Sequence, residues 1–231
     1  MEDLPFWLSL AQQTGGPILE LGCGTGRILA SLARAGYPVV GLDIDADMLA
    51  YLKANLPAGL EPAPHVFLAD MASFCLGREF PLIIMPCNTL SSLPAAVRQA
   101  ALACLRLHLQ PGGVFAASLP NPVVLASMPR LGEPEVEDDF PHPITGNPVQ
   151  VSSAWKRTRR EFILDWQYDH LLTDGNIERL TARTRHLLDP VSIHRAGLSQ
   201  AGLELIQEYG DYDRSPYQAN SPYWIFACRP A

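Results

Sequence analysis

The sequence predicts an α/β protein, a doubly wound and mostly parallel sheet of seven strands whose last strand is antiparallel, with a small antiparallel β lobe inserted before the last helix. Three observations predict this fold. Short apolar runs alternate with segments of helical periodicity between residues 18 and 119. A glycine-rich turn joins the first apolar run to a helix. After residue 120, strands of alternating polarity replace the continuous apolar runs.

The first half of the chain predicts a buried parallel sheet. We expect strands at residues 18–21, 38–42, 65–69, 81–85 and 114–119, and helices at residues 3–14, 27–36, 46–55 and 94–109. These strands are apolar on both faces, which is typical of strands that crossover helices cover on either side.

The second half predicts an insertion followed by the sheet edge. Residues 120–148 are rich in proline and acidic residues, and we expect a long irregular connection there. The alternation in residues 162–168 and the turn signal Asp174-Gly175 predict an antiparallel meander over about 149–188. A helix at about 192–201 and two antiparallel edge strands at 203–209 and 223–228 complete the sheet.

The meander should bury one of its faces. Phe162, Leu164, Trp166 and Tyr168 alternate along one strand and therefore share a face. We expect that face to pack against the substrate side of the large sheet, with the lobe acting as a lid. For Trp166 and Tyr168 we favour the simpler interpretation that they form the packed face of the meander itself.

Composition excludes several classes of protein. The chain has 231 residues, of which 48% are hydrophobic, so a sizeable core can form. The net charge of −7 does not suit a protein that coats nucleic acid or an anionic membrane, and no apolar run is long enough to span a bilayer. The five cysteines form no C-x-x-C pair, so we expect reduced thiols, a cytoplasmic location and no metal site.

The most informative stretch is ELGCGTG, residues 20–26, where a strand runs through glycines into a helix. Glycines there let the backbone turn tightly and let a ligand approach closely. The G-x-G-x-G spacing differs from the G-x-G-x-x-G of dinucleotide binders. The carboxylate of Glu20 would repel a diphosphate and attract an ammonium group. A plain strand–helix turn is the alternative for the glycines alone.

Two further acids end the next strands. Asp43 follows the second strand and can accept hydrogen bonds from two ribose hydroxyls, and Asp70 follows the third strand and can accept from an adenine amine. Ligands of open parallel sheets lie across the carboxyl ends of the strands. Each acid alone could be a helix cap, but together with the glycine loop they indicate a nucleoside site.

On these motifs the sequence resembles the class I S-adenosylmethionine-dependent methyltransferases, which have a Rossmann-like fold. The resemblance rests on ELGCGTGR, GLDIDADML, LADM, PLIIMPCNTLSSL and LRLHLQPGGVF, within residues 17–119. It implies a methylation enzyme, a transferase that uses S-adenosylmethionine and releases S-adenosylhomocysteine. It also implies a cofactor-binding methyltransferase domain at 1–120 and 189–231, with a substrate or lid lobe at 121–188.

The resemblance carries the cofactor contacts over to particular residues. Gly22, Gly24 and Gly26 would wrap the methionine part, with Glu20 facing its ammonium. Asp43 would bind the ribose, while Ile44 and Met48 flank the adenine and Asp70 and Met71 bind its edge. The full set is Glu20, Gly22, Cys23, Gly24, Gly26, Arg27, Asp43, Ile44, Met48, Asp70, Met71 and Cys87. Arg27 either reaches the cofactor carboxylate or is a solvated arginine at a helix start.

The catalytic residues are not identified by these motifs, because methyl transfer needs mainly alignment and a general base only for a protonated nucleophile. Asn88 could orient a substrate amine or hydroxyl, and His170 or His186 could move a proton. Cys87 could be a nucleophile, as in cytosine carbon-5 methyltransferases, but we expect a buried cysteine packed beside the cofactor. The basic run at 156–160 is a solvated strand face or a site for an anionic substrate group.

The leading functional hypothesis is a methyltransferase acting on nitrogen or oxygen of a small molecule. The alternatives are a methyltransferase that acts on a protein or an RNA, a non-catalytic cofactor-binding module, and a nicotinamide-dependent oxidoreductase. The acidic charge disfavours nucleic acid, and the loop spacing with Glu20 disfavours nicotinamide. No membrane partner is expected, and a homodimer stays open.

Overall fold

The computed structural model describes residues 3–231 and divides into two compact units. The larger unit comprises the chain up to Asn121 together with Pro190–Ala231, and the smaller unit is Pro122–Asp189. In the part of the chain that is described, no helix combines the length and apolar character needed to cross a membrane.

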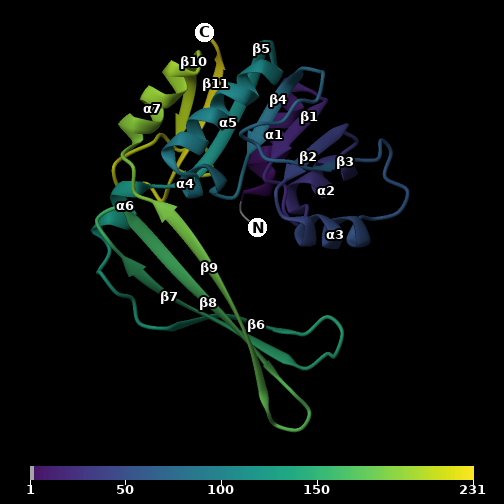
Figure 1. Cartoon of the computed structure of the whole chain (residues 1–231), viewed down its shortest axis with the longest axis vertical. Coiled ribbons are helices and arrows are strands. Elements are labelled where there is room, and N and C mark those ends of the chain that lie inside the picture. Colours follow the sequence, from purple (N-terminus) through teal and green to yellow (C-terminus); the bar gives the residue numbers. More distant parts are fainter. Residues whose placement is uncertain (1–2) are drawn as a thin grey trace. The chain divides into compact units, whose positions relative to one another are not determined.

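A seven-stranded sheet forms the centre of the larger unit (Figure 1). Its spatial order is β10-β11-β5-β4-β1-β2-β3, and only β11 runs antiparallel to its neighbours β5 and β10. The strands are β1 Ile18–Leu21, β2 Val39–Asp43, β3 His65–Leu68, β4 Phe80–Met85, β5 Leu109–Pro120, β10 Leu203–Tyr209 and β11 Tyr223–Pro230. The predicted doubly wound sheet with an antiparallel last strand is confirmed.

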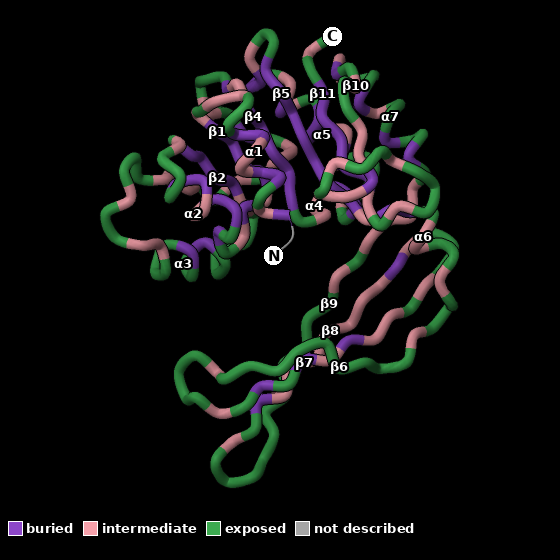
Figure 2. Tube along the Cα trace, turned by 180° about the vertical axis from the view of Figure 1, so that it is seen from behind, coloured by how far each residue is buried: buried purple, intermediate pink, exposed green. Residues whose placement is uncertain are grey.

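Helices cover both faces of this sheet. They are α1 Leu4–Thr14, α2 Arg27–Arg34, α3 Ala46–Asn55, α4 Thr89–Ser92, α5 Ala95–His108 and α7 Val191–Gln200. One core cluster joins α1, α2 and α3 to the sheet, and the other joins α5 and α7 to its opposite face. The central strands are buried almost throughout (Figure 2), as the continuous apolar runs of the sequence predict.

Two details of the large sheet differ from the expectation. The fifth strand begins at Leu109 rather than at residue 114, because Phe80 pairs with Leu109 and Leu82 with Val114. The proline and glycines between those pairs form an irregularity within the strand rather than a turn before it. The short helix α4 was not expected, since four residues are too few to show a helical period.

The smaller unit is built on an antiparallel sheet of four strands in the order β6-β7-β8-β9. Its elements are α6 Pro122–Ser127, β6 Glu135–Pro141, β7 Pro148–Arg157, β8 Glu161–Leu171 and β9 Ile177–Leu187. The predicted antiparallel lobe is confirmed. The expected irregular connection over 120–148 is wrong, since it contains α6 and β6. The exposed acidic strand β6 is held by backbone pairing with β7 rather than by burial.

The two faces of this small sheet differ in polarity. Phe162 is buried on the face predicted to be apolar, but Leu164, Trp166 and Tyr168 are only half-buried. We expected all four side chains to be packed on one buried face. Only Phe162 is fully buried, so that expectation is wrong for the other three. The other face carries ion pairs between strands: Arg179–Asp169, Arg183–Asp165 and Arg185–Glu161.

Candidate active site

The glycine loop lies between β1 and α2 and is tied to β2. The backbone amides of Gly22 and Cys23 both donate to the carbonyl of Leu42, at 2.8 and 2.9 Å. The amide of Gly26 donates to the carbonyl of Cys23 at 2.8 Å and closes the turn. Cys23 itself is buried in the core beneath the loop. The loop is thus anchored by the sheet at the carboxyl ends of β1 and β2.

Two glycines of the loop serve different purposes. A Cβ added at Gly26 would lie 2.7 Å from Cγ of Leu52, so Gly26 lets α2 approach α3. A Cβ added at Gly24 would meet only the Met48 sulfur at 3.6 Å and a carboxylate oxygen of Asp43 at 4.0 Å. Both glycines have left-handed backbones, with φ of 85° and 52°. Gly24 therefore has room around it for a side-chain carbon, whereas Gly26 faces the core.

The carboxylate of Asp43 joins the glycine loop to the end of β2. One oxygen accepts a 2.7 Å hydrogen bond from the amide of Gly24, and the other accepts from the amide of Asp45 at 2.9 Å. A carboxylate oxygen has more than one acceptor site, so Asp43 can still accept from hydroxyls. Sequence reasoning missed the positioning role, because it depends on a contact between residues far apart in the chain.

Glu20 lies inside β1 and is only 2% exposed. Its Oε2 atom is buried and has no hydrogen-bond partner in the described part of the chain. Burial, opposed by the positive charge of Arg27, raises the pKa of Glu20 to about 8. A buried acceptor without a partner is costly, and a cationic donor placed against it would relieve that cost.

The predicted adenine side of the site carries exposed apolar side chains. Ile44 is 71% exposed and Met48 is 45% exposed, at the start of α3. Exposed side chains of this size next to a glycine loop can cover a flat aromatic ligand. At the end of β3, the carboxylate of Asp70 accepts from the amide of Ala72 at 2.8 Å, and Met71 packs on the core.

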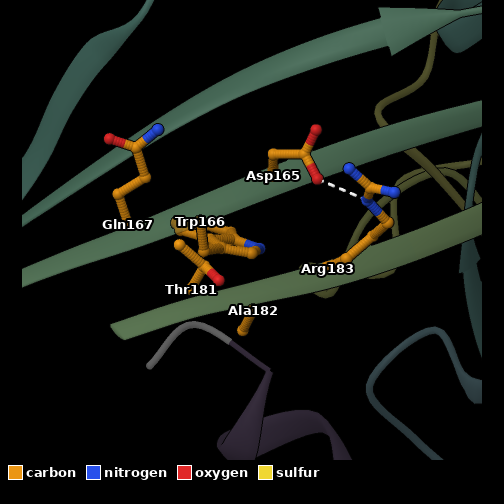
Figure 3. Close-up of a pocket in the computed structure, with 6 residues that line it drawn as sticks. All are labelled: Asp165, Trp166, Gln167, Thr181, Ala182 and Arg183. Carbon is orange, nitrogen blue, oxygen red and sulfur yellow. Dashed lines mark hydrogen bonds and ion pairs between the residues drawn. The ribbon is translucent and has the colours of Figure 1, made fainter. Parts of the chain in front are cut away.

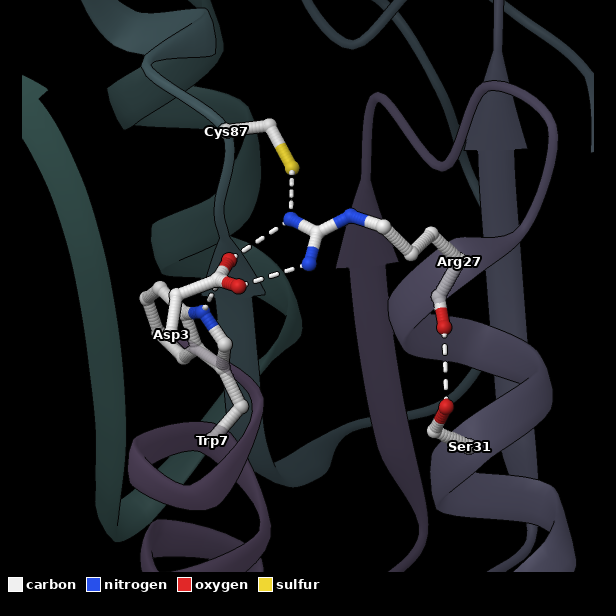
Figure 4. A network of polar contacts seen from close by, with 5 residues as sticks. All are labelled: Asp3, Trp7, Arg27, Ser31 and Cys87. Atoms are coloured by element: carbon white, nitrogen blue, oxygen red, sulfur yellow. Dashed lines mark hydrogen bonds and ion pairs between the residues drawn. The ribbon is translucent and has the colours of Figure 1, made fainter. Parts of the chain in front are cut away.

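Arg27 forms a polar network that sequence reasoning missed. Its two terminal nitrogens each lie 2.6 Å from an oxygen of Asp3, and one of them also lies 3.0 Å from the sulfur of Cys87 (Figure 4). Trp7 donates its indole N–H to Asp3 at 3.3 Å. Arg27 is thus neither a freely solvated arginine nor free to turn wholly to a ligand. It links α1, α2 and the end of β4.

The end of β4 places Cys87 and Asn88 side by side in left-handed conformations, with φ of 58° and 62°. The expectation that Cys87 is buried is wrong. It is exposed, because the turn after Pro86 directs the residue out of the sheet. Asn88 is half-buried, and its Oδ1 atom is buried with no hydrogen-bond partner among residues 3–231.

The two candidate histidines belong to the smaller unit. His170 is buried, stacks on His142 with ring centroids 4.2 Å apart, and has a ring nitrogen 2.9 Å from the hydroxyl of Thr145. Its other ring nitrogen lies 3.5 Å from Glu178. His170 is therefore held inside the lobe. Burial lowers the pKa of His186, which favours its neutral form at pH 7.

A pocket of about 400 Å³ opens beside Trp166 in the same unit. Figure 3 shows Trp166 beside Thr181 and Ala182, with Asp165 and Arg183 ion-paired at 2.5 Å. Trp166 is thus a wall of a surface pocket as well as a packed side chain.

A family model described as a methyltransferase domain matches residues 18–113. Among curated proteins, a dTDP-3-amino-3,4,6-trideoxy-alpha-D-glucopyranose N,N-dimethyltransferase of Streptomyces venezuelae is 31% identical over 98 residues. That match covers 42% of this chain and 39% of the relative. The chain spans well under half the length of the first curated relatives that it matches.

Solved structures resemble nearly the whole chain. An S-adenosylmethionine-dependent methyltransferase from Clostridium acetobutylicum has a TM-score of 0.83 at 14% identity, covering 99% of this chain and 90% of that one. The sugar N-methyltransferase KedS8 from Streptoalloteichus has a TM-score of 0.75 at 20% identity, covering 97% of this chain and 86% of that one.

These findings place the larger unit among methyltransferase domains. Residues 18–113 match a methyltransferase domain, and the fold of the chain is that of solved S-adenosylmethionine-dependent methyltransferases. The residues at the carboxyl ends of β1 and β2 suit the cofactor of that class. The partnerless carboxyl oxygen of Glu20 is complementary to an ammonium, and Gly24 leaves open the space that a side chain would fill.

Proposed function

We propose that the chain transfers a methyl group from S-adenosylmethionine to an amino nitrogen of a small molecule, of which a sugar amine is the leading case. The observation that carries the cofactor half is the buried, partnerless Oε2 of Glu20 beneath a glycine loop. The acceptor half is supported by the amino-sugar N,N-dimethyltransferase and the sugar N-methyltransferase named above, which resemble this chain. The cofactor supplies an electrophilic methyl carbon.

The proposed cofactor contacts follow the strand ends. Glu20 faces the ammonium, and Gly22, Gly24 and Gly26 give the methionine part its path. Asp43 accepts from the ribose hydroxyls while it holds Gly24 in place. Ile44 and Met48 cover the adenine, and Asp70 binds its edge.

The proposed acceptor contacts begin at Asn88. Its buried Oδ1 can accept a hydrogen bond from an amine N–H, which turns the nitrogen lone pair away from Asn88. A primary ammonium must lose a proton before it can attack, so a general base is required. His186 and His170 are the two histidine candidates, and burial favours the neutral form of His186, which a base requires.

We propose that the lobe of residues 121–188 determines which acceptor binds. Variants of the lobe should then change the KM of the acceptor and leave cofactor affinity unchanged. His186→Ala should lower kcat least at low pH, where His186 is already protonated, and most where His186 is neutral and the acceptor amine is still an ammonium.

The test is methyl transfer from methyl-labelled S-adenosylmethionine into three separate pools: amino sugars with a metabolite extract, total protein, and total RNA. We expect label only in the small-molecule pool, and loss of transfer in Glu20→Gln. Label confined to protein or RNA would contradict the acceptor class. Cofactor binding with no transfer to any pool would make the chain a non-catalytic binding module.

A further inference from the structure

The smaller unit carries an open pocket of about 570 Å³ whose lining differs in charge from that of three other pockets in the described residues. It is lined by Arg130, Leu131, Lys156, Arg157, Thr158 and Arg159, which we call the cationic pocket. Four of these residues are basic and none is acidic. In three other pockets of the described residues, the basic side chains share the lining with an acid, as Arg183 does with Asp165.

Backbone pairing brings the two halves of the cationic pocket together. Leu131 forms an antiparallel bridge with Lys156, and the amide of Arg157 donates to the carbonyl of Arg130 at 2.8 Å. The Nε of Arg157 donates to the carbonyl of Met128, also at 2.8 Å. The cationic side chains are therefore placed by a fixed crossing of two segments that are distant in sequence.

Neighbouring contacts hold this crossing in one arrangement. The amide of Gly132 donates to the carbonyl of Trp155 at 2.9 Å, and a Cβ added at Gly132 would lie 2.1 Å from the indole ring. On the other side, the hydroxyl of Thr158 accepts from the amides of Arg160 and Glu161, at 3.1 and 3.0 Å, in the turn between β7 and β8. The backbone that carries the cationic side chains is therefore held in place by these contacts.

The charges of the cationic pocket are not neutralised by the protein. Arg130, Lys156 and Arg159 form no ion pair with any residue of the described chain, and Glu161 beside them pairs with Arg185 at 3.4 Å. Like charges gathered at one site repel one another, and an anion would relieve that repulsion. The chain as a whole has a net charge of −7, so the positive charge of this cluster is opposite in sign to the net charge of the protein.

We propose that the cationic pocket binds a phosphate or diphosphate group, and that the methyl acceptor carries that group. Guanidinium groups bind phosphate oxygens in pairs of parallel hydrogen bonds, and lysine adds a point charge. The first statement concerns the pocket alone. The second rests on the proposed function, because it concerns the molecule that receives the methyl group.

Calorimetric titration of the full chain with inorganic pyrophosphate tests the first statement. The variant Arg130→Gln, Lys156→Gln, Arg159→Gln keeps the backbone bridge and the contact of Arg157. It should bind pyrophosphate about tenfold or more weakly, because charge-assisted hydrogen bonds are lost. The control variant is Arg179→Gln, Arg183→Gln, Arg195→Gln, which removes the same charge from arginines that already have acidic partners.

The control variant should bind pyrophosphate as the unchanged chain does. Absence of pyrophosphate binding in the unchanged chain, or equal weakening in the two variants, would overturn the proposal. Tighter binding of a single-stranded RNA oligonucleotide, lost in the pocket variant, would also overturn it in favour of nucleic acid. If a nucleoside diphosphate binds more tightly than inorganic phosphate, the result supports an acceptor that carries its phosphate as an ester. If inorganic phosphate binds more tightly, the result contradicts such an acceptor.

The same titrations separate this proposal from the proposed function. Both variants should bind S-adenosylmethionine normally. If the chain binds S-adenosylmethionine but not pyrophosphate, the proposal that the cationic pocket binds an anion is wrong, and the proposed function is unaffected. Pyrophosphate binding that depends on the pocket, in a chain that transfers no methyl group, would defeat the proposed function and leave the anion site standing.

Discussion

The carboxylate of Asp43 accepts a 2.7 Å hydrogen bond from the backbone amide of Gly24. The acid that ends β2 thus holds the middle of the glycine loop, which begins after β1. One side chain therefore shapes the loop and faces the position expected for the ribose. This relationship makes cofactor affinity sensitive to Asp43 in two ways.

Asp43→Ala should weaken S-adenosylmethionine binding by about 1–3 kcal/mol, because hydroxyls and a loop amide lose their charged acceptor. Asp45→Ala is the matched control. Asp45 caps α3 by accepting from the amides of Asp47 and Met48. Its loss should cost about 1 kcal/mol of folding stability and change cofactor affinity much less. Equal affinity losses in the two variants, measured by calorimetry, would show that Asp43 is only a local cap.

Alanine at the loop glycines should separate binding from folding. Gly26→Ala places a Cβ against Leu52 and should lower the melting temperature. Gly24→Ala has room among its protein neighbours, so it should cost only the left-handed strain of about 1–2 kcal/mol, yet weaken cofactor binding. Gly36→Ala, with φ of 86° and no atom within 4 Å, measures that strain alone. Normal cofactor affinity in Gly24→Ala would refute the ligand-facing role of Gly24.

The stability of the free protein should fall as pH rises from about 4.5 to about 8 through the effect of Glu20. Burial raises the pKa of Glu20 from its ordinary value of 4.5 to about 8, so the folded chain holds a proton that the unfolded chain releases in that window. Glu20→Gln cannot ionise and should lack this contribution. Denaturant unfolding at several pH values measures the difference, and parallel pH profiles for the two proteins would contradict it.

The affinity for S-adenosylmethionine should change with pH in the opposite direction. An ammonium favours the ionised form of Glu20, so binding should strengthen between pH 6 and about 8 and release a proton. Calorimetry in buffers of different ionisation enthalpy detects that proton. Unchanged proton release in Glu20→Gln would assign the proton to another group.

Asp3→Asn should destabilise the chain by about 1 kcal/mol, a modest value because Arg27 is partly exposed and solvent screens the pair. Burial acts to raise the pKa of Asp3, but the hydrogen bonds and charge of Arg27 hold it below its ordinary value. The stabilisation is therefore present above pH 4 and is lost as pH falls through the lowered pKa. If denaturant unfolding at pH 7 gives Asp3→Asn the same free energy of unfolding as the unchanged chain, the pair of Asp3 and Arg27 does not stabilise the fold.

Much of the large unit could be predicted from local sequence patterns. The apolar runs of β1, β2 and β4 and the glycine turn are signals within a few residues. The short helix α4 and the strand β6 could not be predicted. Four residues show no helical period, and β6 is acidic and exposed along its whole length. Its pairing with β7 depends on backbone hydrogen bonds that leave no pattern in the side chains.

The site divides in the same way. Asp43 and Asp70 lie at strand ends that the sequence indicates, and Glu20 lies in the strand that leads into the glycine loop. The pairing of Arg27 with Asp3 joins residues 24 positions apart, and no local sequence pattern predicts it. The exposure of Cys87 depends on a left-handed turn, which a proline–cysteine dipeptide does not by itself specify.

The central claim is that the carboxyl ends of β1, β2 and β3 bind S-adenosylmethionine rather than another nucleoside cofactor. The most direct measurement is a calorimetric titration of the unchanged chain with S-adenosylmethionine, and separately with NAD. We expect saturable binding of S-adenosylmethionine at one site per chain and far weaker binding of NAD. Equal affinity for the two ligands, or binding of NAD alone, would contradict it.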